Sequence, residues 1–126
     1  MPTTLELSPE QIARYRMAAQ KRRQREQPEI ERRRERAWVA VRTAAQLLQE
    51  RFQVTRLVVF GSLVRETGFN RWSDVDIAAW GIAPEDTFRA IGAVMDLDTE
   101  VRVNLVDVNT ARDSLLAEIE RHGIEL

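Results

Sequence analysis

The stretch LVVFGSLVRETGFNRWSDVDIAAW, residues 57–80, decides the fold. It contains two strand-length runs rich in apolar and β-branched residues, and a glycine, Gly61 or Gly81, directly follows each run. Short runs of this kind, bounded by turn residues, are typical of buried strands. We therefore predict one strand over residues 54–60 and a second over residues 74–80, joined by a turn and a loop.

Two carboxylates lie at the start of the second predicted strand, in the sequence Ser73-Asp74-Val75-Asp76. Side chains two residues apart on a strand point to the same face. Carboxylates that close repel each other unless a cation lies between them. Divalent ions held in this way serve in-line phosphoryl and nucleotidyl transfer. We therefore predict that Asp74 and Asp76 are metal ligands and catalytic residues.

The identity of the metal follows from the side chains that the chain lacks. There are no cysteines and only one histidine, His122. Thiolate sites and histidine-rich zinc sites are therefore excluded, and oxygen ligands remain. Hard oxygen ligands favour Mg²⁺, with Mn²⁺ as the alternative.

Gly61 and Ser62 are the second half of the predicted site. A glycine at a strand end allows the backbone to approach a phosphate closely. We predict that residues 61–65 turn into a short helix, whose first N–H groups favour an anion. The Ser62 hydroxyl and the Arg65 guanidinium would add contacts to a nucleotide, as would Ser73. Structural alternatives remain open: a helix cap for Ser62, an ion pair for Arg65 and a turn cap for Ser73.

The remaining elements complete an α/β (α+β) pattern. A helix is predicted over residues 84–97, with Phe88, Ile91 and Met95 on one face. A third strand is predicted over residues 101–108. A closing helix follows over residues 110–121, with a glycine cap just beyond its end.

The N-terminal part differs in character from the rest of the chain. Residues 1–53 carry 12 basic and 7 acidic side chains, whereas residues 54–126 carry 7 and 13. Helices are predicted over residues 9–26 and 29–51, with a break or kink at Pro28 between them. We therefore expect a basic helical extension, residues 1–53, followed by a catalytic domain, residues 54–126.

The arginine-rich part of the extension allows several functions. Ten basic and four acidic residues lie between Arg14 and Arg36. Nucleic-acid binding is an alternative that is not favoured, because the glutamates allow pairing along the helix and aromatic residues are absent between Arg16 and Trp38. A solvated face or a face docked on a protein partner is favoured, and a homo- or hetero-oligomer would fit.

Length and composition limit the remaining classes. A chain of 126 residues can bury one modest core. No apolar run approaches the roughly 20 residues of a membrane span. The first residues do not have the basic and apolar order of a signal peptide. We therefore expect no membrane partner and a cytoplasmic location.

Residues 54–126 resemble the minimal nucleotidyltransferases (MNT proteins) of the DNA polymerase beta superfamily. Their motif is Gly-Ser, a short spacer and Asp-x-Asp, and here eleven residues separate Ser62 from Asp74. The tail is similar too, in the strand sequence VNLVDV (residues 103–108) and the end ERHGIEL (residues 120–126).

This resemblance implies a nucleotidyltransferase fold, with a small mixed three-stranded sheet flanked by helices. It also implies ATP as the nucleotide donor and magnesium as the cofactor. Many MNT proteins are antitoxins that transfer AMP from ATP onto a tyrosine of a partner HEPN ribonuclease toxin, which neutralises the toxin. On this reading Asp74 and Asp76 hold the metals, while Gly61, Ser62 and Arg65 contact the triphosphate.

The third catalytic position of the family is Asn104 in this chain. The family has a carboxylate there, which binds the catalytic metal and helps to deprotonate the attacking hydroxyl. An asparagine offers a neutral carbonyl oxygen and cannot act as a base. Loss of one key electrostatic group typically costs about 3–4 kcal/mol of transition-state stabilisation.

Two alternatives therefore accompany the enzymatic antitoxin. One is a catalytically impaired MNT protein that binds nucleotide and neutralises its partner by binding. The other is a small-molecule nucleotidyltransferase, although a core of residues 54–126 leaves little room for a further substrate-binding domain.

Overall fold

The structure is a computed structural model and describes residues 8–65 and 68–126. One long helix, α1 (Pro9–Phe52), contains 44 residues. A reciprocal cap begins it: the Gln11 N–H donates to Ser8 Oγ at 3.2 Å, and the Ser8 N–H donates to Gln11 Oε1 at 2.9 Å. It ends at Gln53, whose φ of 53° is left-handed.

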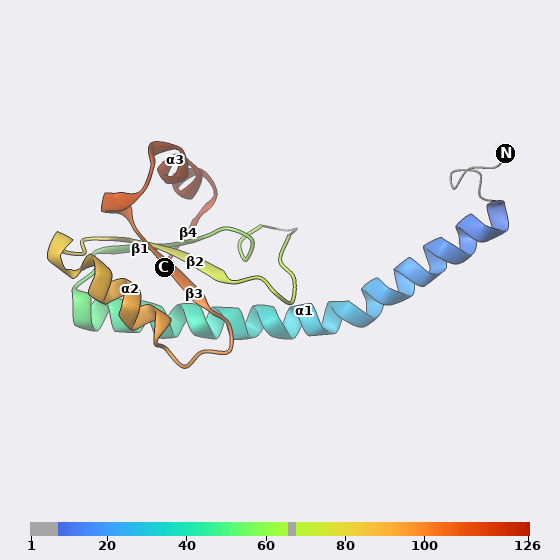
Figure 1. The fold of residues 1–126 in the computed structure, drawn as a ribbon, viewed down its shortest axis with the longest axis horizontal. Helices are drawn as coiled ribbons and strands as arrows, with labels where there is room; N and C mark the ends of the chain where they lie inside the picture. The colour runs from blue at the N-terminus through green and yellow to red at the C-terminus, as the bar shows by residue number, and fades with distance from the viewer. Residues whose placement is uncertain (1–7, 66–67) are drawn as a thin grey trace.

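Of the two alternatives predicted at Pro28, a break or a kink, the break is wrong, because Pro28 lies inside the continuous helix α1. A proline removes one helical hydrogen bond and crowds the carbonyl four residues earlier. That carbonyl belongs to Gln24, an exposed residue in a solvated part of the helix, so water can reach it. The helix axis changes direction along its blue-to-cyan half, but the helix continues (Figure 1).

Four strands form one mixed sheet in the order β3-β2-β1-β4. They are β1 (Arg56–Phe60), β2 (Val75–Trp80), β3 (Val103–Asp107) and β4 (Ile124–Glu125). The β2–β3 pair is parallel, and β1 is antiparallel to both β2 and β4. The predicted fold class is therefore confirmed, with a fourth strand added to the expected three.

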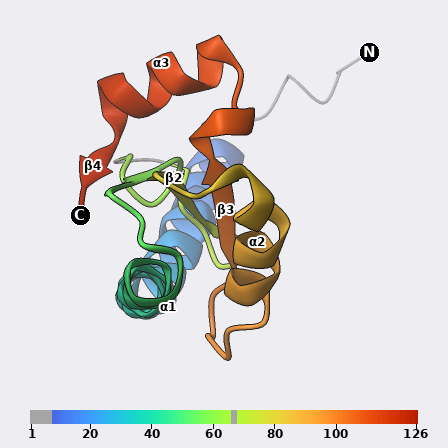
Figure 2. The ribbon, with the colours of Figure 1, turned by 90° about the vertical axis from the view of Figure 1, so that its left-hand side faces the viewer.

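Helices cover both faces of this sheet, as Figure 2 shows. On one face lie α1 and α2 (Thr87–Met95), the latter preceded by a 3₁₀ turn, Pro84–Asp86. On the other face lies α3 (Asp113–His122), which follows a second 3₁₀ turn, Val108–Thr110. The closing helix is thus confirmed, with slightly later bounds than predicted.

The core divides along the same layers. The larger cluster joins α1 and α2 to one face of the sheet, and the smaller one joins α3 to the other face. The α1 side chains in the larger cluster come from the last four turns of that helix: Ala37, Ala40, Val41, Ala44, Leu48 and Phe52. The folded unit therefore uses residues on both sides of position 53, and the division there remains a prediction.

The face predicted for the helix of residues 84–97 does not pack in the core. Phe88 is 88% exposed and Met95 is 62% exposed. The buried side chains of α2 are instead Thr87, Ala90 and Val94. The helical spacing of apolar residues is present as predicted, but a different side of the helix, that of Thr87, Ala90 and Val94, packs on the sheet.

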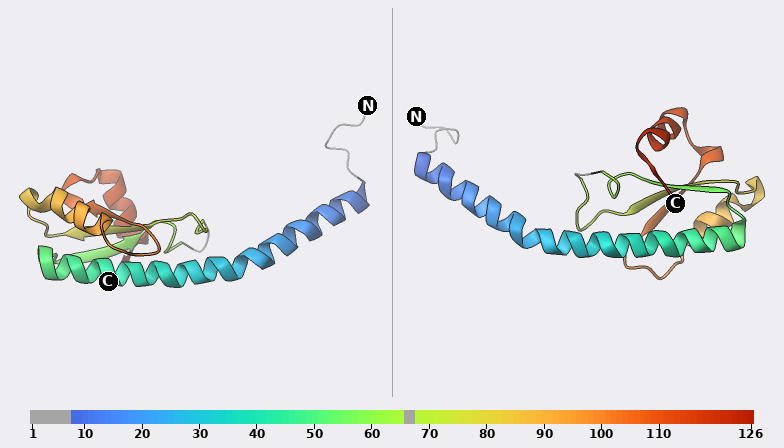
Figure 3. Two further views of the ribbon diagram at one scale, coloured as in Figure 1. Left: turned by 60° about the horizontal axis from the view of Figure 1, so that its bottom comes forward. Right: turned by 180° about the vertical axis from the view of Figure 1, so that it is seen from behind.

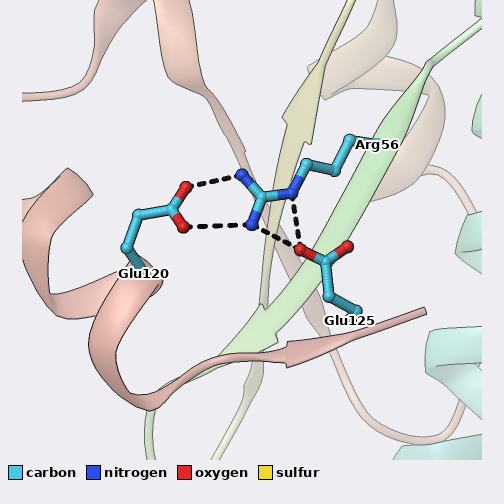
Figure 4. A network of polar contacts seen from close by, with 3 residues as sticks. All are labelled: Arg56, Glu120 and Glu125. Carbon is cyan, nitrogen blue, oxygen red and sulfur yellow. Dashed lines mark hydrogen bonds and ion pairs between the residues drawn. The ribbon is translucent and has the colours of Figure 1, made fainter.

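The C-terminal strand β4 is held by an ion-pair network around Arg56 (Figure 4). Arg56 donates from Nη2 to Glu120 Oε2 at 3.1 Å and from Nε to Glu125 Oε1 at 2.6 Å. The hydrogen bonds to Glu120 and Glu125 raise the pKa of Arg56, and the same contact lowers the pKa of Glu120. The guanidinium also lies 4.2 Å from the Trp80 ring centroid.

The N-terminal half of α1 extends away from the layered part as a free arm (Figure 3). Its residues are almost all exposed from Pro9 to Glu29. Within residues 8–65 and 68–126, no helix has the length and apolar character needed to cross a membrane.

Candidate active site

The candidate site lies at one end of the strands, where β1 ends and β2 and β3 begin. Phe60, the last residue of β1, is paired with Asp76, and Asp76 is paired with Asn104 on the other side. Neighbouring positions of β2 alternate between the two faces. Val75 and Ile77 belong to the α1 cluster, so Asp76 points to the α3 face of the sheet.

Asp76 and Asn104 are in direct contact. The Asn104 Nδ2 group donates to Asp76 Oδ1 at 3.4 Å. Asn104 therefore lies directly beside Asp76 on the neighbouring strand. Asp74 lies two residues before Asp76, just outside β2, and both carboxylates are half-buried.

Burial raises the pKa of Asp76 above its ordinary value of 3.8. The hydrogen bond from Asn104 lowers this pKa, the Asp74 carboxylate raises it and the Arg65 guanidinium lowers it. Asp76 is therefore a carboxylate whose charge the fold only partly compensates. A cation bound between the two aspartates would supply the missing compensation.

Gly61 leaves the space that the Asp76 carboxylate occupies. Its φ of +84° lies in the left-handed region, and a Cβ added there would lie 2.5 Å from Asp76 Oδ2. Any other residue would therefore be strained in its backbone and would displace the carboxylate. The glycine is required by the site as well as by the turn.

The turn predicted after Gly61 is described by the structure as far as residue 65. Residues 61–65 form turns, with the Val64 N–H donating to the Gly61 carbonyl at 3.3 Å. The predicted turn over residues 61–65 is therefore present, and residues 66–67, which any helix beginning there would enter, lie outside the described residues. Ser62 is half-buried in this turn, so an anion there would meet turn N–H groups and not a helix N-terminus.

Arg65 forms an ion pair with α3. Its Nη2 lies 3.0 Å from Glu118 Oε1, with both side chains substantially exposed. This is the structural alternative foreseen for Arg65, although the pair lies close enough to Asp76 to influence its pKa. Exposed ion pairs contribute little to stability, so the guanidinium can exchange this carboxylate for a phosphate at low cost.

Ser73 acts as a turn cap in this structure. Its Oγ accepts from the Asn70 N–H at 2.9 Å and donates to the Gly68 carbonyl at 3.4 Å. These bonds hold the end of the loop that leads into Asp74. The hydroxyl is therefore occupied within the loop.

Two arginines of α1 hold the site loop, and the sequence analysis missed them. Arg33 donates to the Ser73 carbonyl from Nη2 at 2.8 Å, and Arg34 donates to the Leu63 carbonyl from Nη1 at 2.9 Å. The signal that could have found them is helical phase. Counting back four residues from Ala37, or seven from Val41, leads to these two arginines on the buried side of the helix.

Asp107, the acidic residue at the end of β3, has a structural role. It is 1% exposed, accepts from Thr87 Oγ1 at 2.6 Å and accepts from the Asn109 N–H at 3.0 Å. Asp107 lies three residues beyond Asn104, is buried and is bonded to Thr87, so it does not replace a carboxylate at position 104.

The donor set fits a magnesium ion. Mg²⁺ is commonly held by one or two protein carboxylates together with substrate phosphates. Asp74 and Asp76 supply two carboxylates, and the Asn104 amide presents its oxygen after a half-turn about its last torsion. Within the described residues no cluster of three acidic, histidine or cysteine side chains could hold a metal alone. The ion would therefore share its coordination with a phosphate.

A family model matches the part of the chain that contains the sheet and the candidate site. The model of the polymerase beta nucleotidyltransferase domain matches residues 42–126. The chain therefore belongs to this family of nucleotidyltransferases. No curated protein matches the chain.

Two crystal structures of the toxin–antitoxin pair MntA–HpeT, each of a different mutant, have a similar fold. The matched chains align with TM-scores of 0.53 and 0.54 at 21% identity. The alignments cover 67% and 68% of this chain and 69% of each matched chain. At this identity the likeness concerns the fold alone.

Proposed function

We propose that this protein is an MNT antitoxin that transfers AMP from ATP onto a tyrosine of a partner HEPN ribonuclease toxin. The observation that carries the proposal is the arrangement of Asp76, with Gly61 on one side and Asn104 on the other. It supports a site for a metal-bound triphosphate at the sheet edge, on a nucleotidyltransferase fold. The fold's likeness to chains of a toxin–antitoxin pair favours a toxin as the partner.

In this proposal each side chain has a separate task. Asp74 and Asp76 hold magnesium, which neutralises charge on the triphosphate when bound. The turn at Gly61 and Ser62 admits a phosphate close to the backbone. Arg65 leaves Glu118 and pairs with a phosphate oxygen, which guanidinium groups bind well.

The raised pKa of Asp76 links metal binding to proton release. Burial favours the protonated carboxyl group, whereas a metal ligand must be ionised. Binding of the cation therefore displaces any proton on Asp76, and acidification weakens metal binding. The loss begins at a higher pH than an ordinary aspartate would give.

Asn104 supports a second candidate, a binding antitoxin with an impaired transfer step. Its amide cannot accept the proton of an attacking tyrosine hydroxyl. Nucleotide binding depends on the two aspartates and the turn, so it would survive. The partner would then be neutralised by contact.

The test uses the purified protein, Mg²⁺, ATP radiolabelled in its α-phosphate and the toxin encoded beside it. We expect label on a toxin tyrosine and no label with the Asp76→Asn variant. The Asn104→Asp variant should label faster, by up to a few hundred-fold if a full electrostatic group is restored.

The outcomes separate the candidates. Transfer by Asn104→Asp alone would favour the binding antitoxin and identify Asn104 as the cause of inactivity. Label on a small hydroxyl compound, with none on protein from either version, would refute the antitoxin proposal.

A further inference from the structure

One stripe of α1 carries cations from the arm to the layered part of the molecule. Lys21, Arg25, Arg32 and Arg36 follow Arg14 at 7, 11, 18 and 22 residues. These offsets are about 2, 3, 5 and 6 turns of 3.6 residues, so the five side chains lie on one side of the helix. All five are exposed, and the stripe spans roughly 33 Å. We call them the cationic stripe.

The cationic stripe leads into a hollow beside the site loop. The hollow has a volume of about 330 Å³, and its charged lining is Arg32, Arg33, Arg36, Arg71, Glu29 and Glu100. Arg33 also binds the Ser73 carbonyl, directly before Asp74. The stripe therefore ends at the loop that carries the first aspartate.

The carboxylates in the hollow do not hold its arginines firmly. Arg36 lies 2.8 Å from Glu100, and the two side chains are 58% and 67% exposed. Arg71 lies 4.0 Å from Glu26 and is also exposed. Surface pairs of this kind are weak and salt-sensitive, so an incoming phosphate can replace either carboxylate.

An aromatic side chain lies beside the same hollow. Trp72 is 75% exposed, and the adjoining pocket that it lines shares Glu29 and Arg71 with the hollow. The Arg71 guanidinium stacks 4.5 Å from the Trp72 ring centroid. The sequence lacks aromatics within the basic stretch, but the fold brings Trp72 beside it, next to Glu26, Glu29 and Ile30.

We propose that the cationic stripe and the Trp72 platform bind single-stranded nucleic acid. A row of guanidinium groups follows a phosphate backbone, and an exposed aromatic ring stacks on a base. An acidic protein would use the charges but would give Trp72 no stacking partner. The proposal concerns binding only, so it stands whether or not the protein transfers AMP.

Fluorescence anisotropy of a labelled oligouridylate, titrated at several salt concentrations, tests the proposal. Five phosphate contacts predict a slope of log K against log salt of about −3.5 for a single strand. Arg14→Gln with Arg25→Gln should make this slope shallower by about 1.4.

A matched control removes the same charge from the other side of the arm. Arg16 and Arg23 follow Arg14 at 2 and 9 residues, about half a turn out of phase, and both are exposed. Arg16→Gln with Arg23→Gln should leave the slope nearly unchanged. Equal effects of the two double variants would overturn the stripe as a site.

Trp72 provides a readout independent of charge. Trp72→Ala should weaken binding roughly fivefold or more with no change in slope, because one stacked base contributes about 1–3 kcal/mol. Trp72→Phe should retain most of the affinity. An unchanged affinity in Trp72→Ala, or binding of labelled polyglutamate but not of oligouridylate, would overturn the nucleic-acid proposal and assign the stripe to an acidic protein.

Discussion

At the scale of single residues, Asp76 is the position where folding and metal binding make opposite demands. Its pKa is raised because its carboxylate is partly buried, so the folded protein favours the neutral form. An ionised Asp76 therefore opposes folding at neutral pH as long as no cation is bound.

We predict that Asp76→Asn raises the melting temperature of the metal-free protein at pH 7. The wild-type penalty is present above the raised pKa of Asp76 and disappears as pH falls through it, so the difference should vanish below the ordinary value of 3.8. Thermal melts in EDTA across this range measure it. Added Mg²⁺ should then stabilise only the wild type. A variant that melts lower at pH 7 would contradict this account.

Comparing Gly61 with Gly68 separates two effects of adding a Cβ: backbone strain at a positive φ, and a steric clash with Asp76. Both have positive φ, +84° and +97°, but a Cβ on Gly68 meets nothing within 4 Å, whereas one on Gly61 reaches Asp76. We predict that Gly61→Ala weakens Mg²⁺ binding at least tenfold, measured by titration calorimetry, because the carboxylate must move. Gly68→Ala should cost about 1–3 kcal/mol of stability and leave Mg²⁺ affinity unchanged. Equal affinities of the two variants would exclude the clash as the cause.

The candidate site residues differ in how far the sequence could predict them. The sequence predicted that Asp74 and Asp76 lie close together, and both lie at the start of β2, with Asp74 just before the strand. Their role as metal ligands stays a prediction. The register that brings Asn104 to Asp76 agrees with the position suggested by the family motif. Helical phase could have placed Arg33 and Arg34 on the buried side of α1, but it could not identify their partners, which are backbone carbonyls 40 and 29 residues away.

At the scale of elements, the end of α3 depends on close packing at Gly123. Its φ is −72°, so its backbone suits any residue. A Cβ there would nevertheless overlap Val58 Cγ1 and lie 2.5 Å from the Ile119 carbonyl oxygen. The predicted glycine cap at Gly123 is present, and the glycine is needed there for space and not for conformation.

We predict that Gly123→Ala destabilises the protein by about 1–3 kcal/mol, because β1 and the end of α3 must separate. Gly92→Ala is the control, since a Cβ at this position of α2 meets nothing within 4 Å. It should stabilise by about 0.5–1 kcal/mol through helix propensity. Urea unfolding measures the free energy of unfolding of both variants. If Gly123→Ala leaves it unchanged, β1 and α3 can move apart without loss of stability, which would contradict this prediction.

The elements that the sequence predicted well are those with a strong local pattern. The apolar runs ending at Phe60 and Trp80 place β1 and β2 to within a residue or two of their bounds. The two residues of β4 carry no such pattern. They pair with β1 because Arg56 holds Glu120 and Glu125 and because the Leu126 N–H donates to the Leu57 carbonyl at 3.0 Å.

At the scale of the whole molecule, the N-terminal half of α1 forms the free arm, and its C-terminal part packs in the core. We predict that deletion of residues 1–29 leaves the melting temperature within a few degrees of the full chain. Deletion of residues 1–52 should leave the rest unfolded, because it removes six buried side chains. One large-to-small core change alone costs about 2–5 kcal/mol of a typical 5–15 kcal/mol. Circular dichroism melts of the two truncations decide whether the folded unit begins near residue 30 or at the predicted boundary after residue 53.

The unbroken path of α1 through Pro28 has a mechanical consequence. A helix of 44 residues is roughly 66 Å long, and Arg33 and Arg34, just beyond the arm, tie this helix to the loops of the candidate site. The arm therefore holds its residues at fixed distances from these loops. The helix also fixes the direction in which each side chain points, because each residue adds a constant rotation about the helix axis. Inserting about two whole turns would shift whatever the arm holds outward without rotating it, whereas inserting half a turn would swing Arg14 to the opposite side. The helix therefore determines both the distance and the orientation, relative to the folded part, of any molecule bound along the arm.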